Sequence, residues 1–310
     1  MSSYPDILAI DPMPDVMRER LEKIFTIHPF TSLENLKAIS TRIRGVTTGG
    51  GSGVSTEIMD MLPNLEVISV NGVGTDRIDL NEASRRNIRV ATTQNTLTDD
   101  VADMAIVLMM TVMRGIITND QFVRAGKWPS APLPMGHSLT GKRVGIAGFG
   151  HIGQAIAKRV SAFNMEVAYF NSRARPESRY RYEPDLKALA GWCDVLILAV
   201  SGGPRSTNMV NAEILDALGK NGVLVNIARG TVVDETALIK YLRQNEIAGA
   251  GLDVFQNEPQ INHDFFSLSN VVLQAHQASA TIETRAAMAN LVADNIITYF
   301  NEGKVLTPVN

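Results

Sequence analysis

Three kinds of polar side chain follow three successive apolar runs in the second half of the sequence. Arg229 comes after Val223–Val225, a carboxylate (Asp253 or Glu258) comes after the next run, and His276 comes after the last. An arginine pairs with a planar carboxylate in fork geometry and polarises a ketone. A histidine protonates the developing alkoxide, and a neighbouring carboxylate orients the imidazole and favours its charged form. Each residue alone is more often a solvated or packed side chain, but their order after successive strands favours reduction of a 2-oxo acid.

The stretch 142–171 has the pattern that would place a cofactor beside these residues. An apolar run, Val144–Ala147, leads into Gly148-Phe149-Gly150-His151-Ile152-Gly153, and a helical pattern and a second apolar run, Val167–Phe170, follow. A glycine-rich turn between a strand and a helix at this spacing is typical of dinucleotide binding. A plain surface turn is the alternative, and the flanking strand and helix argue against it.

The three glycines of this turn have separate physical roles. Gly148 permits the tight turn, Gly150 lets the backbone approach a pyrophosphate, and Gly153 allows the helix to pack closely on the strand. The backbone N–H groups at His151 and Ile152 begin the new helix, whose positive dipole end favours phosphate. We therefore expect the turn to bind a dinucleotide pyrophosphate.

The end of the second strand of this unit predicts a preference for NADP(H). A unit that binds NAD would place an acidic residue there to bind the ribose hydroxyls, but the sequence has Asn171, followed by Ser172 and Arg173. A guanidinium binds a 2′-phosphate by paired, charge-assisted hydrogen bonds, and the serine adds a donor. NAD(H) stays possible, and a solvated basic loop is the alternative.

The first part of the chain alternates strand-like and helical segments, which is typical of a parallel α/β domain. The expected strands are Ile7–Ile10, Ile43–Thr48, Leu65–Val70 and Arg89–Thr92, and the expected helices are Pro14–Phe25, Thr56–Leu62 and Asp79–Arg86. The turn Asn71-Gly72-Val73-Gly74 follows one of these strands. Its backbone amides can hold a substrate carboxylate, unless the glycines only tighten the turn.

The rest of the chain predicts a second domain. Thr98-Asp99-Asp100 should cap a long helix, Val101–Arg114, which is apolar nearly all round and so should be buried between domains or at a subunit interface. An irregular arm is expected over 119–140, and the final helix over Ile282–Phe300. Further strands are expected at Asp194–Val200, Gly222–Ile227, Gly249–Val254 and Val271–Leu273. We expect a substrate-binding domain of residues 1–98 and 285–310 and a dinucleotide-binding domain of residues 99–284.

Composition narrows the class of protein. The chain has 310 residues, 45% of them hydrophobic, and a formal net charge of −3. It therefore has no overall positive charge that would favour binding of nucleic acid. Cys193 is the one cysteine, which excludes a disulfide within the chain and cysteine-based metal sites. The N-terminal sequence lacks the pattern of a secretory signal, and the longest apolar stretch is too short to span a bilayer. A cytoplasmic protein without a membrane segment is expected, with no metal site.

These motifs together resemble the D-isomer-specific 2-hydroxyacid dehydrogenase family, and within it the NADPH-dependent glyoxylate/hydroxypyruvate and hydroxyphenylpyruvate reductases. The similarity runs from Val70–Asp76 through the glycine turn and Asn171–Arg173 to Ala228-Arg229-Gly230, Gly251–Phe255, Glu258-Pro259 and His276. It implies a homodimer of subunits that each have two Rossmann-like or flavodoxin-like domains with parallel sheets, and an active-site cleft between the domains. Ala275, where many members have proline, and Ser201–Thr207, where many have a proline–threonine turn, depart from the family pattern.

The resemblance also implies a role for each candidate residue. Arg229 would bind the substrate carboxylate and carbonyl, Glu258 would pair with the histidine, and His276 would be the acid/base. Asn71 and the amides of Val73 and Gly74 would contact the substrate. The residues expected to border the cofactor, besides the glycine turn and 171–173, are Val200, Ser201, Ile227, Ala228 and, at the nicotinamide carboxamide, Asp253. Trp128 would help to size the substrate from the partner subunit or serve plain packing.

The resulting hypothesis is an NADPH-dependent reductase of glyoxylate, hydroxypyruvate or a similar small 2-oxo acid, which yields D-2-hydroxy acids. The alternatives are another activity of the same family (2-ketogluconate reductase, phosphoglycerate dehydrogenase or phosphonate dehydrogenase) and a non-catalytic protein that senses NAD(P).

Overall fold

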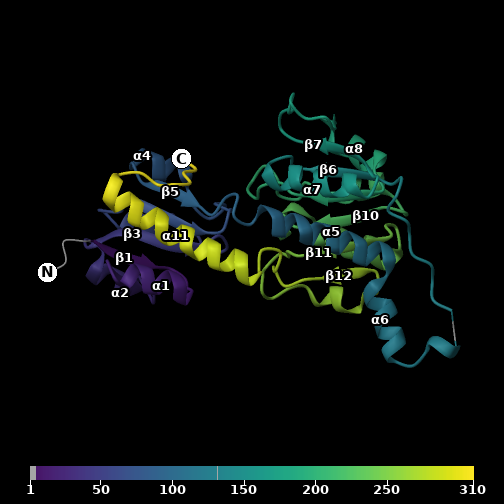
Figure 1. The fold of residues 1–310 in the computed structure, drawn as a ribbon, viewed down its shortest axis with the longest axis horizontal. Coiled ribbons are helices and arrows are strands. Elements are labelled where there is room, and N and C mark those ends of the chain that lie inside the picture. The colour runs from purple at the N-terminus through teal and green to yellow at the C-terminus, as the bar shows by residue number, and fades with distance from the viewer. Residues whose placement is uncertain (1–4, 131) are drawn as a thin grey trace. The chain divides into compact units, whose positions relative to one another are not determined.

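The computed structural model describes residues 5–130 and 132–310. The chain forms two compact units, Met1–Leu97 with Ala280–Asn310 and Thr98–Ser279 (Figure 1). The sequence placed these boundaries after residues 98 and 284. Residues 1–4, which belong to the N-terminal stretch without a signal pattern, and residue 131 of the expected arm lie outside the described residues.

The first unit is built on a parallel sheet with the strand order β2-β1-β3-β4-β5, the order of a flavodoxin-like fold. Its strands are β1 Asp6–Ala9, β2 Thr26–Pro29, β3 Ile43–Gly49, β4 Val67–Asn71 and β5 Arg89–Thr92. Successive side chains of a strand point to opposite faces. Accordingly Ile7 packs with α1 (Asp15–Glu22) and α11 (Ile282–Glu302). The next residue, Leu8, packs with residues of α2 (Leu33–Ile39), α3 (Thr56–Met61) and α4 (Leu80–Arg85) on the other face.

The second unit has a longer parallel sheet with the strand order β12-β11-β10-β9-β6-β7-β8. Its strands are β6 Arg143–Ala147, β7 Glu166–Phe170, β8 Arg181–Tyr182, β9 Val195–Leu198, β10 Val223–Asn226, β11 Gly249–Leu252 and β12 Val271–Leu273. The chain builds outward from β6 through β7 and β8, and then returns to β9 on the opposite side. This reversal creates a switch point at the carboxyl end of β6, where open α/β sheets bind ligands.

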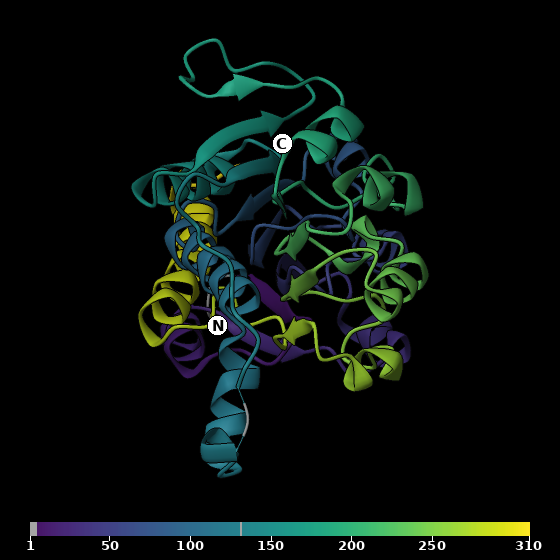
Figure 2. The same cartoon turned by 90° about the vertical axis from the view of Figure 1, so that its right-hand side faces the viewer.

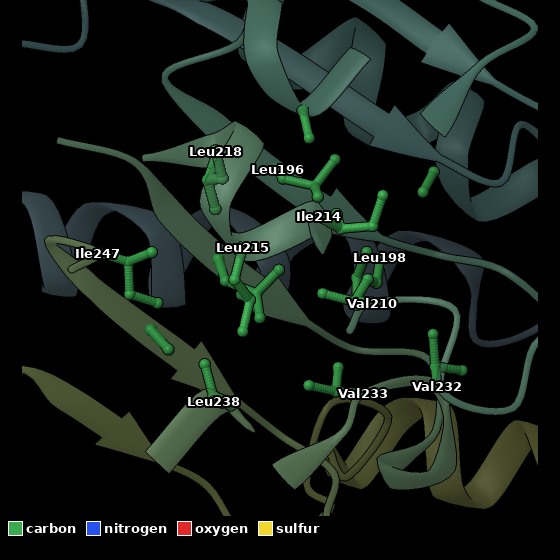
Figure 3. Close-up of a cluster of buried hydrophobic side chains, with 14 of the residues drawn as sticks. Leu196, Leu198, Val210, Ile214, Leu215, Leu218, Val232, Val233, Leu238 and Ile247 are labelled. Carbon is green, nitrogen blue, oxygen red and sulfur yellow. The ribbon is translucent and has the colours of Figure 1, made fainter. Parts of the chain in front are cut away.

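Helices cover both faces of the second sheet. A Cβ placed on Gly145 would meet Leu189 of α8 (Leu186–Trp192), whereas Ile146 lies beside α7 (His151–Ala162). The α8 face also carries α9 (Ala212–Leu218) and α10 (Glu235–Gln244), and Figure 3 shows their buried leucine and isoleucine side chains in one cluster with those of β9. The α7 face carries α5 (Thr98–Arg114), which packs on β10 and β11. The predicted α/β architecture with two parallel sheets is therefore confirmed.

The helix α5 begins earlier than predicted. It begins at Thr98 rather than after a cap formed by residues 98–100, so the acidic pair Asp99 and Asp100 lies inside its first turn. It packs on its own sheet, where Gly251 and Gly249 leave room for the side chains of Leu108 and Val112. Its expected burial between domains or at a subunit interface stays a prediction.

The arm expected to be irregular over 119–140 is in part helical. The helix α6 runs from Ile116 to Arg124, and a short 3-10 turn follows at Trp128–Ser130. Gly115 has a left-handed conformation (φ 59°), which ends α5 and lets the chain turn by 59° into α6. Figures 1 and 2 both show α6 projecting away from the sheet of its unit.

Besides α6, the elements β2, α2 and β8 were not predicted, and α8, α9 and α10 were not given bounds from the sequence. The strand β2 lies at an edge of its sheet and contains His28 and Pro29, so it lacks the apolar run that marks the central strands. Elsewhere the expected elements are present, with ends displaced by a few residues. Within the described residues no single helix is both long and apolar enough to cross a membrane, although α5 and α6 taken together would pass by length and composition despite their bend.

Candidate active site

A carboxylate and an imidazole meet at the carboxyl end of the second sheet. Glu258 follows β11 and His276 follows β12, and the distance from Glu258 Oε2 to His276 Nδ1 is 2.7 Å. The His276 side chain is 46% exposed and that of Glu258 is 31% exposed, so a ligand can reach the pair. Because Nδ1 is bonded to the carboxylate, Nε2 is the ring nitrogen that can exchange a proton with a substrate.

The environment of Glu258 keeps it ionised. Burial alone would raise the pKa of this carboxyl, but the hydrogen bond from His276 and the backbone N–H of Phe255 (2.7 Å to Oε1) oppose this. The positive charges of His276 and Arg229 act in the same direction, and together these contacts hold the pKa of Glu258 below its ordinary value.

Asp253 shapes the loop that carries His276. This carboxylate is 1% exposed and accepts hydrogen bonds from the backbone N–H groups of Gln277 (2.8 Å) and Ala278 (3.1 Å). Its backbone carbonyl accepts from His276 N (2.8 Å), and His276 itself has a left-handed conformation with φ 53°. Burial raises the pKa of Asp253, although the two amide donors oppose the shift. The contact with the nicotinamide carboxamide implied by the family stays a prediction; the observed contacts order the loop.

The turn after β10 places Arg229. The side chain of Asn226, buried at the last position of β10, accepts from Ala228 N (3.0 Å) and donates to Arg229 O (3.0 Å). Arg229 is half-buried, and its Nη1 donates to Ala228 O (2.7 Å). The next residue, Gly230, lies so close to the neighbouring turn that a Cβ there would stand 1.9 Å from the carbonyl carbon of Phe255. The turns that carry Arg229 and Glu258 therefore pack directly on each other.

The glycine turn has the shape that a dinucleotide pyrophosphate requires. Gly148 has φ +96°, and a Cβ there would lie 2.5 Å from Ala199 O, so a side chain does not fit. At Gly150 a Cβ would find no described atom within 4 Å, which leaves the backbone open to an approaching ligand. Gly150 is also the N-cap residue of α7 and has no side chain to cover the amides of His151 and Ile152. The residues present thus fit the phosphates of a dinucleotide.

The side chain of Asn171 links the glycine turn to the basic loop. Its Oδ1 lies 3.5 Å from Phe149 N, and its Nδ2 donates to Arg173 O (3.0 Å). Ser172 and Arg173 are exposed beside it. The structure therefore brings these three residues to the turn, with Asn171 ordering the loop rather than reaching outward.

The remaining cofactor candidates lie along the same strand ends. Val200 and the exposed Ser201 follow β9, next to the backbone of Gly148. Ile227 and Ala228 are both buried, so they offer little surface to a ligand, and their place beside the cofactor stays a prediction.

Trp128 lies in the 3-10 turn that follows α6, not at the strand ends that carry the other candidates, and it is 72% exposed. This exposure argues against plain packing within one chain. Its role in sizing the substrate stays a prediction.

In the first unit, the turn after β4 combines an open backbone with buried polar atoms. Val73 is 40% exposed, and Gly72 O accepts from Thr93 N (2.9 Å). Among the described residues, Asn71 Oδ1 and Thr93 Oγ1 are buried without a hydrogen-bond partner. A buried polar atom without a partner is costly, so the side chain of Asn71, which is only partly buried at this turn, is suited to a polar ligand.

Two residues that order the site were not predicted. Asn226 is the polar last residue of an otherwise apolar strand, and this break in the pattern was its only signal. Glu235, near the start of α10, is 8% exposed and accepts from Gln256 N. In the sequence it resembles an ordinary acidic residue in the first turn of a helix, so nothing there distinguishes it.

Comparison with known proteins agrees with this arrangement. Residues 106–278 match the family model described as the NAD binding domain of D-isomer specific 2-hydroxyacid dehydrogenases. A 2-ketogluconate reductase of Gluconobacter oxydans is 76% identical over 309 residues, which cover 100% of each chain. A hydroxyphenylpyruvate reductase of Plectranthus scutellarioides is 39% identical over 98% of each chain.

A solved structure has the same fold over nearly the whole chain. It is an NADPH-dependent glyoxylate/hydroxypyruvate reductase from Sinorhizobium meliloti in complex with NADP and malonate, with a TM-score of 0.92 and 38% identity over 99% of this chain and 97% of that one. The family match, the full-length relatives and the shared fold together show that this chain is an oxidoreductase that belongs to the D-isomer-specific 2-hydroxyacid dehydrogenase family.

Proposed function

We propose that this protein reduces 2-ketogluconate, with NADPH as the preferred cofactor, to the corresponding D-2-hydroxy acid. The observation that carries the proposal is the pair formed by Glu258 and His276, with Nδ1 2.7 Å from the carboxylate and Arg229 nearby. Such a pair is suited to delivering a proton to a ketone oxygen as the carbonyl is reduced. The 2-ketogluconate reductase relative supports this substrate. The sequence favoured glyoxylate or hydroxypyruvate and retained 2-ketogluconate reductase as an alternative.

Each of the three side chains has a distinct task in this mechanism. When bound, the reduced nicotinamide supplies a hydride to C2 of the oxo acid. Arg229 binds the substrate carboxylate and steadies the negative charge that develops on the ketone oxygen. His276 delivers a proton from Nε2 to that oxygen. Glu258 keeps the imidazole oriented and favours its protonated form.

The first unit supplies further groups for the substrate in this proposal. The amides of Val73 and Gly74 would add donors to the carboxylate. Asn71 Oδ1 is an acceptor, so it matches a hydroxyl donor of the substrate better than a second carboxylate. 2-Ketogluconate carries a chain of hydroxyl groups, whereas glyoxylate has none, and this difference favours the sugar acid.

A substrate panel at fixed NADPH concentration tests the proposal. We expect kcat/KM for 2-ketogluconate to exceed the values for glyoxylate, hydroxypyruvate and 4-hydroxyphenylpyruvate by at least about tenfold, the size of a single well-made contact. A larger value for glyoxylate would contradict the choice of substrate. Saturable NADPH binding without oxidation by any 2-oxo acid would favour a dinucleotide-sensing protein instead.

The preference for NADPH is proposed to depend on Arg173. Replacing Arg173 with alanine should raise the dissociation constant of NADPH by roughly 10- to 100-fold, because the 2′-phosphate loses a charge-assisted partner. The dissociation constant of NADH, which has no 2′-phosphate, should change less than about twofold. Fluorescence titration with both cofactors measures this. Arg179→Ala is the control, since the Arg179 guanidinium lies over the Tyr180 ring. Equal losses for the two cofactors in Arg173→Ala would favour the solvated-loop interpretation.

A homodimer is proposed to form through α6. Ile116, Ile117 and Val123 are each about half exposed. The structure describes every residue of α6, and none of them is buried. Such an apolar surface is typical of an interface. Ile117→Glu should convert a dimer into a monomer, as measured by light scattering coupled to gel filtration. Val16→Glu makes the same change at an exposed valine of α1 and should leave the dimer intact. A wild-type monomer would contradict the proposal.

A further inference from the structure

A second buried carboxylate holds the turn that carries Glu258. Glu235 lies in the first turn of α10 and is 8% exposed, and its Oε1 accepts a hydrogen bond from Gln256 N. The side chain of Gln256 adds a second link, from its Nε2 to Val233 O (3.0 Å), just before the same helix. The start of α10 is thus joined at two points to the turn after β11.

The next contact along this turn leads to the imidazole. Phe255 N donates to Glu258 Oε1 (2.7 Å), and Glu258 Oε2 holds His276 Nδ1 (2.7 Å). Two consecutive backbone amides, at Phe255 and Gln256, are therefore held by two different carboxylates. Because the two amides are adjacent in the chain, a movement of Gln256 N is expected to displace Phe255 N, the donor that holds Glu258.

Glu235 occupies this position at an energetic cost. Burial raises the pKa of its carboxyl, the N–H of Gln256 opposes that shift, and the negative charge of Glu258 raises the pKa further. Buried carboxylates are costly unless a partner compensates them. Here the compensating partner is a backbone amide of the turn that carries Glu258, so the carboxyl and the turn hold each other in place.

We propose that Glu235 is a positioning residue of the reductase, which fixes the turn 255–258 and thereby keeps Glu258 against His276. The inference rests on the proposed roles of Glu258 and His276. Glu235 acts through its hydrogen-bond acceptor, so glutamine should replace it, because the amide oxygen of glutamine accepts from the same N–H. Alanine removes the acceptor and frees the turn.

The test compares Glu235→Ala, Glu235→Gln and a matched control, Asp234→Ala. Asp234 is the adjacent carboxylate on α10, but it caps the helix by accepting from Ala237 N (3.0 Å). We expect Glu235→Ala to lower kcat by about tenfold or more with KM for NADPH within about twofold of wild type. Glu235→Gln should keep kcat within about threefold. Asp234→Ala should lower the thermal midpoint and leave kcat nearly unchanged.

The pH profile of kcat separates positioning from a general loss of stability. Reduction by this mechanism uses a proton that the imidazole delivers to the ketone oxygen, so kcat is expected to fall at alkaline pH. Glu258, whose pKa is lowered, stays ionised and favours the protonated ring. The other charged groups near the pair are Asp253, Arg229 and Glu235, whose carboxyl interacts with that of Glu258. When the turn loosens, the ring loses its carboxylate partner. The falling limb should therefore move to lower pH in Glu235→Ala, but not in Asp234→Ala, nor in Glu235→Gln, which removes the same charge and keeps the acceptor.

Several outcomes would overturn the inference. An unchanged limb in Glu235→Ala, or a shift of equal size in Asp234→Ala, would make Glu235 merely structural, and so would a Glu235→Gln variant as impaired as Glu235→Ala. If Glu235→Ala does not fold, Glu235→Asp, whose shorter side chain withdraws the acceptor, is measured in the same way. Should substitution of His276 itself leave turnover intact, the proposed function fails, which is distinguishable from failure of this inference alone.

Discussion

Replacing His276 with asparagine should lower kcat for 2-oxo acid reduction by roughly 10²- to 10⁴-fold, the usual contribution of a positioned general acid. The dissociation constant of NADPH should stay within about twofold, because the glycine turn and the 171–173 loop are unchanged. Asparagine is chosen because it tolerates the left-handed backbone that His276 adopts (φ 53°), so the loop can keep its conformation. Stopped-flow measurement of NADPH oxidation and a separate titration of NADPH binding give the two quantities.

A histidine outside the site provides the control for this experiment. His263 stacks on Phe266 in the 3-10 turn His263–Ser267. His263→Asn should therefore retain wild-type turnover. If His276→Asn turned over at the wild-type rate, the ring would not be the proton donor. If it lost NADPH binding to the same extent as turnover, the loop would serve the cofactor rather than the chemistry.

Replacing Arg229 with alanine should lower kcat/KM by roughly 10³-fold, the upper range for removing one group that stabilises a developing oxyanion. The substrate would lose its bidentate carboxylate partner, and the ketone oxygen would lose the charge that steadies it. Arg229→Lys should fall between wild type and alanine, because lysine keeps the charge but lacks the planar fork. Steady-state kinetics with 2-ketogluconate measure all three proteins.

The control for this substitution is an arginine outside the site. Arg243, in the last turn of α10, forms an ion pair with Asp264 (3.2 Å), and both side chains are more than half exposed. Arg243→Ala should leave kcat/KM within about twofold, since exposed ion pairs contribute little. An Arg229→Lys enzyme as active as wild type would contradict fork recognition. An active Arg229→Ala enzyme would remove the residue from the mechanism.

The candidate trio could be predicted because parallel sheets have a simple geometry. The carboxyl ends of neighbouring strands meet at one edge, so polar residues that follow successive apolar runs come together there. Glu258 and His276 follow adjacent strands and are in contact, and the charge of Arg229 acts on Glu258. The same reasoning placed Asn71–Gly74 at the corresponding edge of the first sheet.

The supporting contacts could not be predicted, because they depend on packing between segments far apart in the chain. Glu235 and Gln256 are 21 residues apart, and only the folded structure places the start of α10 against the turn after β11. α6 was missed because the left-handed Gly115 interrupts the helical pattern and α6 has no buried stripe. β2 was missed because an edge strand needs no apolar run. The prediction that both domains line one cleft stays a prediction.

The most direct test is a single-turnover experiment with enzyme in excess over NADPH and saturating 2-ketogluconate. We predict that the NADPH absorbance is lost completely and that one equivalent of the 2-hydroxy acid forms, with the D configuration at C2. Full retention of the NADPH absorbance by a protein that binds the cofactor, or formation of the L product, would contradict the account.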